Sequence, residues 1–115
     1  MTRLLSLVAA NFLALTAAPA AAAGAGNFTI VNMSGADWQS LSIRRYGTED
    51  WRPLGPVPAQ RARSVVQFSD ADCAFDIRAV IAGEGPVVWQ GVNLCQVNAV
   101  ILNRNARGAT WVDYQ

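Results

Sequence analysis

Two cysteines, Cys73 and Cys95, constrain the possible fold of this chain more than any other feature of its sequence. Residues 73–82 and 87–95 both have the β-branched and aromatic content of strands, and the turn sequence Gly-Glu-Gly-Pro separates them. A hairpin centred on Glu84 places the cysteines opposite each other, where facing Cα atoms are about 4.5–5.5 Å apart and a disulfide can form. The sequence therefore predicts a hairpin whose open end is closed by a disulfide.

The same register divides the hairpin's side chains between two faces, because successive residues of a strand point to opposite sides. On the apolar face we expect four facing pairs: Phe75 with Asn93, Ile77 with Gly91, Ala79 with Trp89, and Ile81 with Val87. We expect Asp76, Arg78 and Gln90 on the opposite face. Asp76 then forms either a surface ion pair or a buried contact with a neighbouring arginine or with loop amides.

The N-terminal segment, residues 1–23, has the pattern of a secretory signal peptide. A positively charged start is followed by an apolar run at residues 4–15, which is shorter than a transmembrane helix, and then by small residues of the Ala-x-Ala kind. Cleavage is expected after Ala23, or after Ala22. The sequence therefore predicts an exported protein, periplasmic or secreted, with no membrane span after cleavage, and such compartments permit disulfides.

The composition excludes several classes of function. The chain contains no histidine and no lysine, so it lacks the residues for Ser-His-Asp, Cys-His, Schiff-base and phosphate-loop chemistry. After signal cleavage the arginines equal the carboxylates in number, and no basic excess remains for nucleic acid. The two cysteines have no companion ligands for a metal site. We therefore expect no cofactor, no metal and no nucleic-acid partner.

The rest of the mature chain consists of short runs with strand character and shows no helical repeat of useful length. Strands are expected at residues 27–33, 38–45, 61–68, 73–82, 87–95 and 98–103, the last of them buried on both faces. Residues 104–115 form a C-terminal tail, in which residues 110–114 are either a short edge strand or a segment that docks Trp111. The fold class is therefore all-β: a single domain over residues 24–103, folded as a small antiparallel β-sandwich or partly closed barrel of six to seven strands with one intra-hairpin disulfide.

The hairpin resembles a family of small exported bacterial proteins of unknown function. Its members have a Cys-x-aromatic-Asp-apolar-Arg strand, similar to residues 73–78, and end with Gly-Val-(Asn or Asp)-Leu-Cys, similar to residues 91–95. The turn at residues 32–35 and the loop around Trp51 are also similar. The resemblance extends to about Asn103 but not into the tail, and it departs where this chain has Pro-Ala-Gln before its third strand. It implies an exported β-fold and transfers no activity or site residue.

The candidate binding surface surrounds the loop at residues 46–55, where arginines outnumber carboxylates and aromatic residues lie among them. Arginine and aromatic residues are enriched at protein interfaces. The predicted surface comprises Arg44, Arg45, Tyr46, Trp51, Arg52, Arg61 and Arg63. The structural alternative is that Trp51 closes one end of the sandwich while the arginines are solvated or paired.

Pairs of carboxylates offer a second functional interpretation, because glycosidases need two of them across a cleft. Asp70 with Asp72, and Glu49 with Asp50, are close in sequence, and the turn at residues 69–72 also offers oxygen ligands to calcium. Solvated turns explain the same residues without a function. We therefore favour an exported, non-enzymatic β-domain that binds an unknown partner protein, cell-envelope polymer or anionic ligand. The alternative is a carboxylate-dependent glycan hydrolase or a calcium-binding module.

Overall fold

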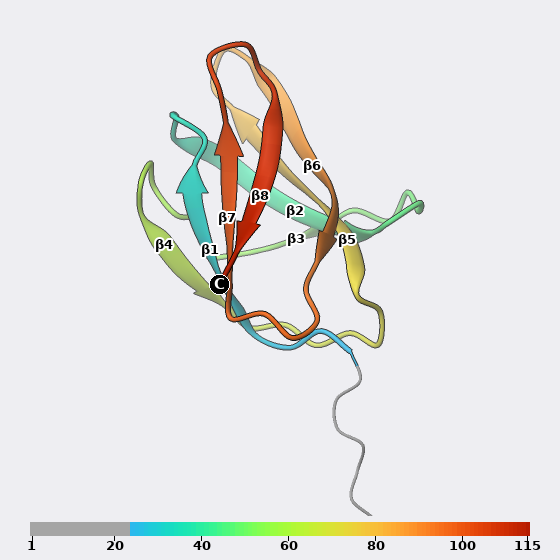
Figure 1. Cartoon of the computed structure of the whole chain (residues 1–115). Coiled ribbons are helices and arrows are strands. Elements are labelled where there is room, and N and C mark those ends of the chain that lie inside the picture. The colour runs from blue at the N-terminus through green and yellow to red at the C-terminus, as the bar shows by residue number, and fades with distance from the viewer. Residues whose placement is uncertain (1–23) are drawn as a thin grey trace, which may run out of the picture.

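The computed structural model describes residues 24–115, which form eight strands in two four-stranded sheets (Figure 1). The predicted signal peptide lies outside the described residues. Those residues contain no helix with the length and hydropathy needed to cross a membrane. The strands are β1 (Phe28–Met33), β2 (Trp38–Arg45), β3 (Arg52–Pro53), β4 (Arg63–Val66), β5 (Ala74–Ile81), β6 (Gly85–Asn93), β7 (Ala99–Arg104) and β8 (Thr110–Tyr114).

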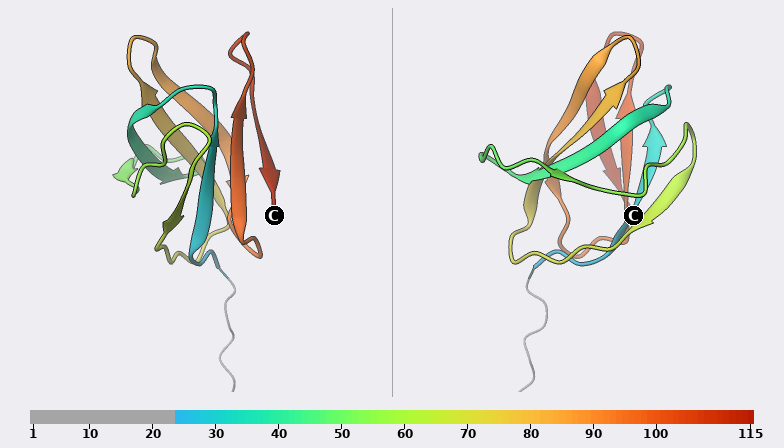
Figure 2. Two further views of the ribbon diagram at one scale, coloured as in Figure 1. Left: turned by 90° about the vertical axis from the view of Figure 1, so that its left-hand side faces the viewer. Right: turned by 180° about the vertical axis from the view of Figure 1, so that it is seen from behind.

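The two sheets pack face to face as a β-sandwich, which confirms the predicted fold class (Figure 2). One sheet has the strand order β4-β1-β7-β8, and the other has the order β3-β2-β5-β6. Neighbouring strands are antiparallel except for β1 and β7, which run in parallel. This parallel pair joins β1 to the hairpin of β7 and β8. The β4-β1-β7-β8 sheet is therefore completed only when both ends of the domain are present.

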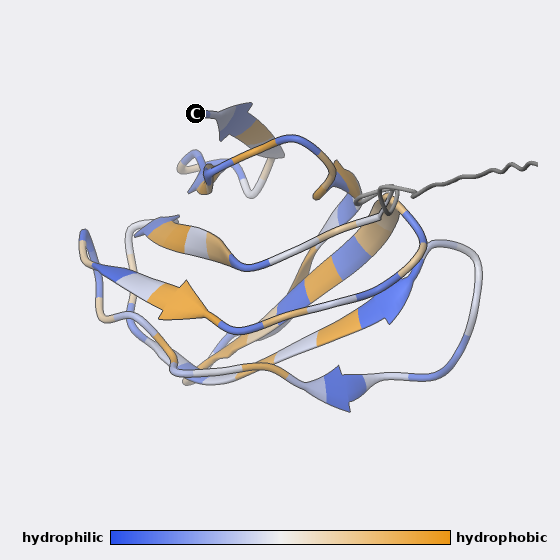
Figure 3. Cartoon of the chain, turned by 90° about the horizontal axis from the view of Figure 1, so that it is seen from below, coloured by the Kyte–Doolittle hydropathy of each residue, from blue (hydrophilic) through white to orange (hydrophobic). Residues whose placement is uncertain are grey.

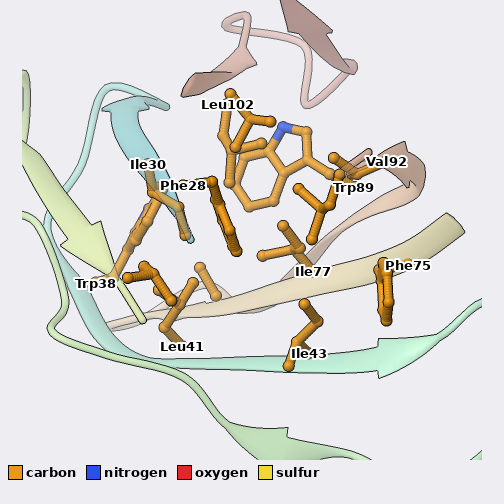
Figure 4. Close-up of a cluster of buried hydrophobic side chains, with 14 of the residues drawn as sticks. Phe28, Ile30, Trp38, Leu41, Ile43, Phe75, Ile77, Trp89, Val92 and Leu102 are labelled. Atoms are coloured by element: carbon orange, nitrogen blue, oxygen red, sulfur yellow. The ribbon is translucent and has the colours of Figure 1, made fainter. Parts of the chain in front are cut away.

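Alternation of apolar and polar residues along the strands builds the core between the sheets. Figure 3 shows hydrophobic and hydrophilic residues alternating along the ribbons, as expected for strands with one buried face. The inward-facing side chains of both sheets meet around Trp89, which is 1% exposed (Figure 4). Its indole N–H also donates a hydrogen bond of 2.8 Å to the carbonyl of Asn103 in β7. The largest buried side chain is thereby tied to both sheets.

Several predicted strands differ from the observed ones at their ends. β2 has the predicted bounds, but the strand expected at residues 61–68 is reduced to β4, because Arg61 has a left-handed φ of 66° and interrupts regular pairing. β3 was not predicted, since only two residues pair there. β7 is buried on its inner face, and on its outer face Ala99 is buried whereas Ile101 is only partly buried. Residues 110–114 form β8 at the sheet edge, where Trp111 is 47% exposed and not docked.

The Cys73–Cys95 disulfide is confirmed, with a Cα–Cα distance of 5.1 Å, but the predicted register between the cysteines is wrong. Near the turn the observed and expected partners differ by two residues: Ile77 faces Trp89, Ala79 faces Val87 and Ile81 faces Gly85. The turn is centred on Gly83, one residue earlier than expected. A β-bulge then adds a residue to β6, so that Phe75 faces Val92 and the cysteines are brought back within reach of each other.

We expect the disulfide to contribute a large share of the stability of this small domain. It closes a loop with a sequence separation of 22 residues, and replacing both cysteines (C73S/C95S) is expected to lower the free energy of unfolding by about 3 kcal/mol. For a domain of this size the melting temperature falls by about 4–8 °C per kcal/mol. Thermal denaturation followed by circular dichroism measures the shift. Reductant should lower the melting temperature of the wild type and leave that of the double variant unchanged. Equal melting temperatures of the oxidised wild type and the double variant would contradict the prediction.

Candidate functional site

The structure separates the seven residues of the predicted binding surface into different places. Arg44, Arg45 and Arg52 lie around one cleft at an edge of the sandwich. Tyr46 is 61% exposed in the loop after β2. Trp51 packs against two arginines on the outward face of the β3-β2-β5-β6 sheet. Two further arginines of the predicted surface, Arg61 and Arg63, lie before and at the start of β4 in the other sheet, and neither lines this cleft.

The cleft has a volume of about 260 Å³ and combines apolar with charged lining residues. Ile43, Phe68 and Phe75 supply the apolar part, and the rings of Phe68 and Phe75 meet edge to face with centroids 5.2 Å apart. The polar lining comes from the end of β2, the following loop, and the segment between β4 and β5. It consists of Arg44, Arg45, Thr48, Asp50, Arg52, Ser69 and Asp70.

Asp76 is 1% exposed and fixes the position of Arg44, one of the residues that line the cleft. Its Oδ2 accepts a hydrogen bond of 2.8 Å from Nε of Arg44, and its Oδ1 accepts one of 2.9 Å from the backbone N–H of Gly91 in the β6 bulge. Of the two arrangements expected for Asp76, a surface ion pair or a buried contact with an arginine or amides, the structure has the buried contact. A buried carboxylate needs such partners, because isolated charge is costly away from water.

Trp51 covers the arginines that flank Asp76. The guanidinium carbon of Arg44 lies 4.4 Å from the centre of its ring, and that of Arg78 lies 4.1 Å away. Nε of Arg78 also donates a hydrogen bond of 3.1 Å to Oγ of Ser42 on the neighbouring strand. Trp51 therefore stacks on the outer face of a sheet and does not close an end of the sandwich, which corrects the structural alternative. Cation–π contacts of this kind fix the loop that carries Asp50 and Arg52.

Arg45 links the cleft to the start of the described chain, at Ala25. Its guanidinium lies 3.1 Å from the Asp70 carboxylate and 3.2 Å from that of Asp72, and the backbone of Asp70 pairs with Ala25. Partial desolvation favours the neutral carboxyl, but the backbone N–H of Asp72 and the Arg45 guanidinium outweigh it and hold the pKa of Asp70 below its usual value. The hydrogen bond from the Arg45 guanidinium to the Asp70 carboxylate raises the pKa of Arg45. Asp70 therefore remains ionised at neutral pH.

Among the carboxylates, Asp50 and Asp70 both line the cleft, and each lies beside an arginine: Asp50 is 2.9 Å from Arg52 and Asp70 is 3.1 Å from Arg45. The lowered pKa of Asp70 disfavours it as the proton donor of a glycosidase. Asp72 and Glu49, their sequence neighbours, do not line the cleft. Within residues 24–115 no three carboxylate or cysteine side chains gather as a possible metal site. Both carboxylates of the cleft are therefore engaged by arginines.

Part of the cleft could not be found from the sequence. The sequence predicts Phe75 on the apolar face of the hairpin and Phe68 as the last residue of a strand, and it identifies Asp70 only as one of a pair of turn carboxylates. The sequence pattern around each of these residues is local, whereas the cleft brings residues 43–52 together with residues 68–75.

Comparison of the chain with family models, curated proteins and solved structures finds no match. The site is therefore interpreted from its own geometry.

Replacement of Asp76 tests its role in holding Arg44 and the β6 bulge. D76A removes the acceptor for the Gly91 amide and the partner of Arg44, so we expect the free energy of unfolding to fall by about 2–4 kcal/mol in urea denaturation. D76N keeps an acceptor oxygen and should lose less. The matched control is E49A, since the Glu49 side chain also contacts Arg44 but is 93% exposed. Its removal should lower the free energy of unfolding by less than about 0.5 kcal/mol. Equal losses for D76A and E49A would contradict the assigned role.

Proposed function

We propose that this chain is an exported binding domain whose cleft takes up a ligand combining an acidic group with an apolar part. The observation that carries the proposal is the lining of the cleft, where three arginines border an apolar patch made by the partly exposed Phe68 and the buried Ile43 and Phe75. Ligand sites are generally apolar concavities with a few convergent polar groups. The apolar patch accommodates the hydrophobic part, and Arg45 and Arg52 receive the acidic group.

The arginines retain hydrogen-bonding capacity for such a ligand. Arg52 uses Nε and Nη2 for Asp50, and Arg45 uses Nε and Nη2 for the two turn aspartates. Each guanidinium has five N–H donors, so the Nη1 groups of both residues remain available among the described contacts. A planar fork of this kind favours a carboxylate, phosphate or sulfonate. The aspartates keep the guanidinium groups oriented without occupying all of their donors.

The size of the cleft limits what it can bind. At about 260 Å³ it is slightly smaller than the roughly 300–1,000 Å³ typical of sites for drug-sized molecules. The cleft therefore suits a small amphiphilic acid, or one acidic and apolar element of a larger partner. An unknown partner protein or a cell-envelope polymer meets this description when it presents such an element at its surface or end.

Export is the second part of the proposal. It is supported by the signal-peptide pattern of residues 1–23 and by the disulfide, which persists in oxidising compartments. The resemblance of the hairpin to small exported bacterial proteins points to the same compartments. The domain would thus meet its ligand in the periplasm or outside the cell.

Ligand binding is tested with 8-anilinonaphthalene-1-sulfonate, a probe that joins a sulfonate to apolar rings. In amide NMR titrations of the ¹⁵N-labelled domain we expect the largest shifts at cleft residues such as Thr48, Ser69 and Asp70. R52Q should weaken binding about fivefold, which corresponds to about 1 kcal/mol. The matched control R107Q removes a charge from the turn between β7 and β8 and should bind the probe as the wild type does. Shifts centred elsewhere, or equal effects of both variants, would refute the proposed site.

Export is tested by expressing the full chain in a bacterial host and measuring the intact mass of the protein in each cell fraction. The periplasmic or secreted fraction should contain a protein that starts at Gly24, or at Ala23, with both cysteines oxidised, because the signal peptide is removed on export. A variant with an arginine introduced into the apolar run should instead accumulate uncleaved in the cytoplasm. An uncleaved wild-type chain with free thiols in the cytoplasmic fraction would show that export is wrong, without bearing on the cleft.

A further inference from the structure

The outward face of the β4-β1-β7-β8 sheet carries much of the exposed apolar surface of the domain. Met33, Val65 and Trp111 are 42%, 64% and 47% exposed, and all three point away from the core according to the strand register. Between them on the two central strands lie Val31, which is 9% exposed, and Ile101, which is partly buried. None of these residues lines the cleft of the proposed function. This surface therefore requires an explanation of its own.

One row across this face has opposite charges at its two ends. Arg63 on β4 is the register partner of Val31 on β1, Val31 is the partner of Ile101 on β7, and Ile101 is the partner of Asp113 on β8. Arg63 and Asp113 are both exposed. Asp113 accepts a hydrogen bond of 3.1 Å from the amide of Asn103, and neither charge has an ion-pair partner among residues 24–115.

This row is complementary to itself under one particular symmetry. A two-fold axis parallel to the strands, passing between β1 and β7, exchanges the two ends of the row while keeping it level with the same row of a second copy. Arg63 of each copy then faces Asp113 of the other, and Val31 faces Ile101. An axis along the row would instead place the two Arg63 side chains against each other. The charges therefore select one of the two face-to-face arrangements.

We propose that a second copy of this chain covers the outward face of the β4-β1-β7-β8 sheet in an isologous dimer. The two sheets stack in the aligned manner of β-sandwiches, with the Arg63–Asp113 contact formed twice at the rim and apolar residues at the centre. Trp111 at the edge then lies opposite the end of the second copy where the exposed Arg61 precedes β4. Tryptophan and arginine are both enriched in interfaces.

The size of the face sets the strength expected of the dimer. Four strands about 4.8 Å apart and about six residues long, each residue rising about 3.3 Å, cover about 19 by 20 Å. This is smaller than a standard interface, which buries about 800 Å² on each partner. The dimer is therefore reversible, and the cleft of each copy stays outside the interface. Dimerisation would let two clefts engage one polymeric or surface-bound partner.

Sedimentation equilibrium of the signal-cleaved, disulfide-bonded protein tests the dimer. The wild type should change from monomer to dimer with increasing concentration. Arg63→Asp and Asp113→Arg should each weaken association about tenfold, because each places like charges together at both symmetric contacts. The double variant should restore association. Arg107→Asp, a matched charge reversal on the turn between β7 and β8, should leave it unchanged.

A second measurement uses the wild type alone and does not depend on how the variants fold. On dilution of the ¹⁵N-labelled protein, amide signals of Val31 and Ile101 should shift, whereas those of the cleft should not. A protein that stays monomeric up to about 1 mM, where the association free energy would be weaker than about 4 kcal/mol, overturns the proposal. So does a double variant that stays as weak as the single ones, or assembly beyond the dimer. Loss of the dimer with intact probe binding in the cleft would leave the proposed function standing.

Discussion

The contact between the buried carboxylate of Asp76 and the backbone amide of Gly91 is the interaction on which the arrangement of this domain depends. Gly91 occupies the bulge of β6 with a left-handed φ of 64°, a conformation that glycine adopts without the steric cost borne by other residues. The bulge leaves its amide without a regular ladder partner, and Asp76 accepts the hydrogen bond at 2.9 Å. The second carboxylate oxygen is then free to receive Arg44.

This polar contact determines how the apolar core is filled. Without the extra residue in β6, strict alternation would direct Trp89 and Val92 to opposite faces of the sheet, because they are three positions apart. The bulge turns both inward, and both are almost fully buried. On the outer side, Arg44 is fixed between Asp76 and the ring of Trp51. One carboxylate therefore coordinates the packing of the core with the conformation of the loop that borders the cleft.

Features set by short stretches of sequence could be predicted, and those set by contacts between distant residues could not. The bounds of β2, the hairpin and the Cys73–Cys95 bridge follow from alternation, turn residues and cysteine placement. The register of that hairpin could not be predicted, because the bulge depends on a partner for the Gly91 amide that lies on another strand. The parallel pairing of β1 with β7, and the meeting of Phe68 with the end of β2, arise only when both sheets have formed.

The arginines show why residue counting overestimates a binding surface. Arginine is the only basic side chain in this sequence, and the sequence predicts an excess of positive charge around the loop at residues 46–55. In the structure Asp70, Asp72 and Asp76 pair with arginines of the same region, so this excess disappears. Arg44 is committed to structure on both sides of its guanidinium. Recognition in the cleft must therefore depend on the orientation of the remaining N–H donors, because paired charges at short range produce little net field. Unpaired charges act differently, since they determine which surfaces can face each other.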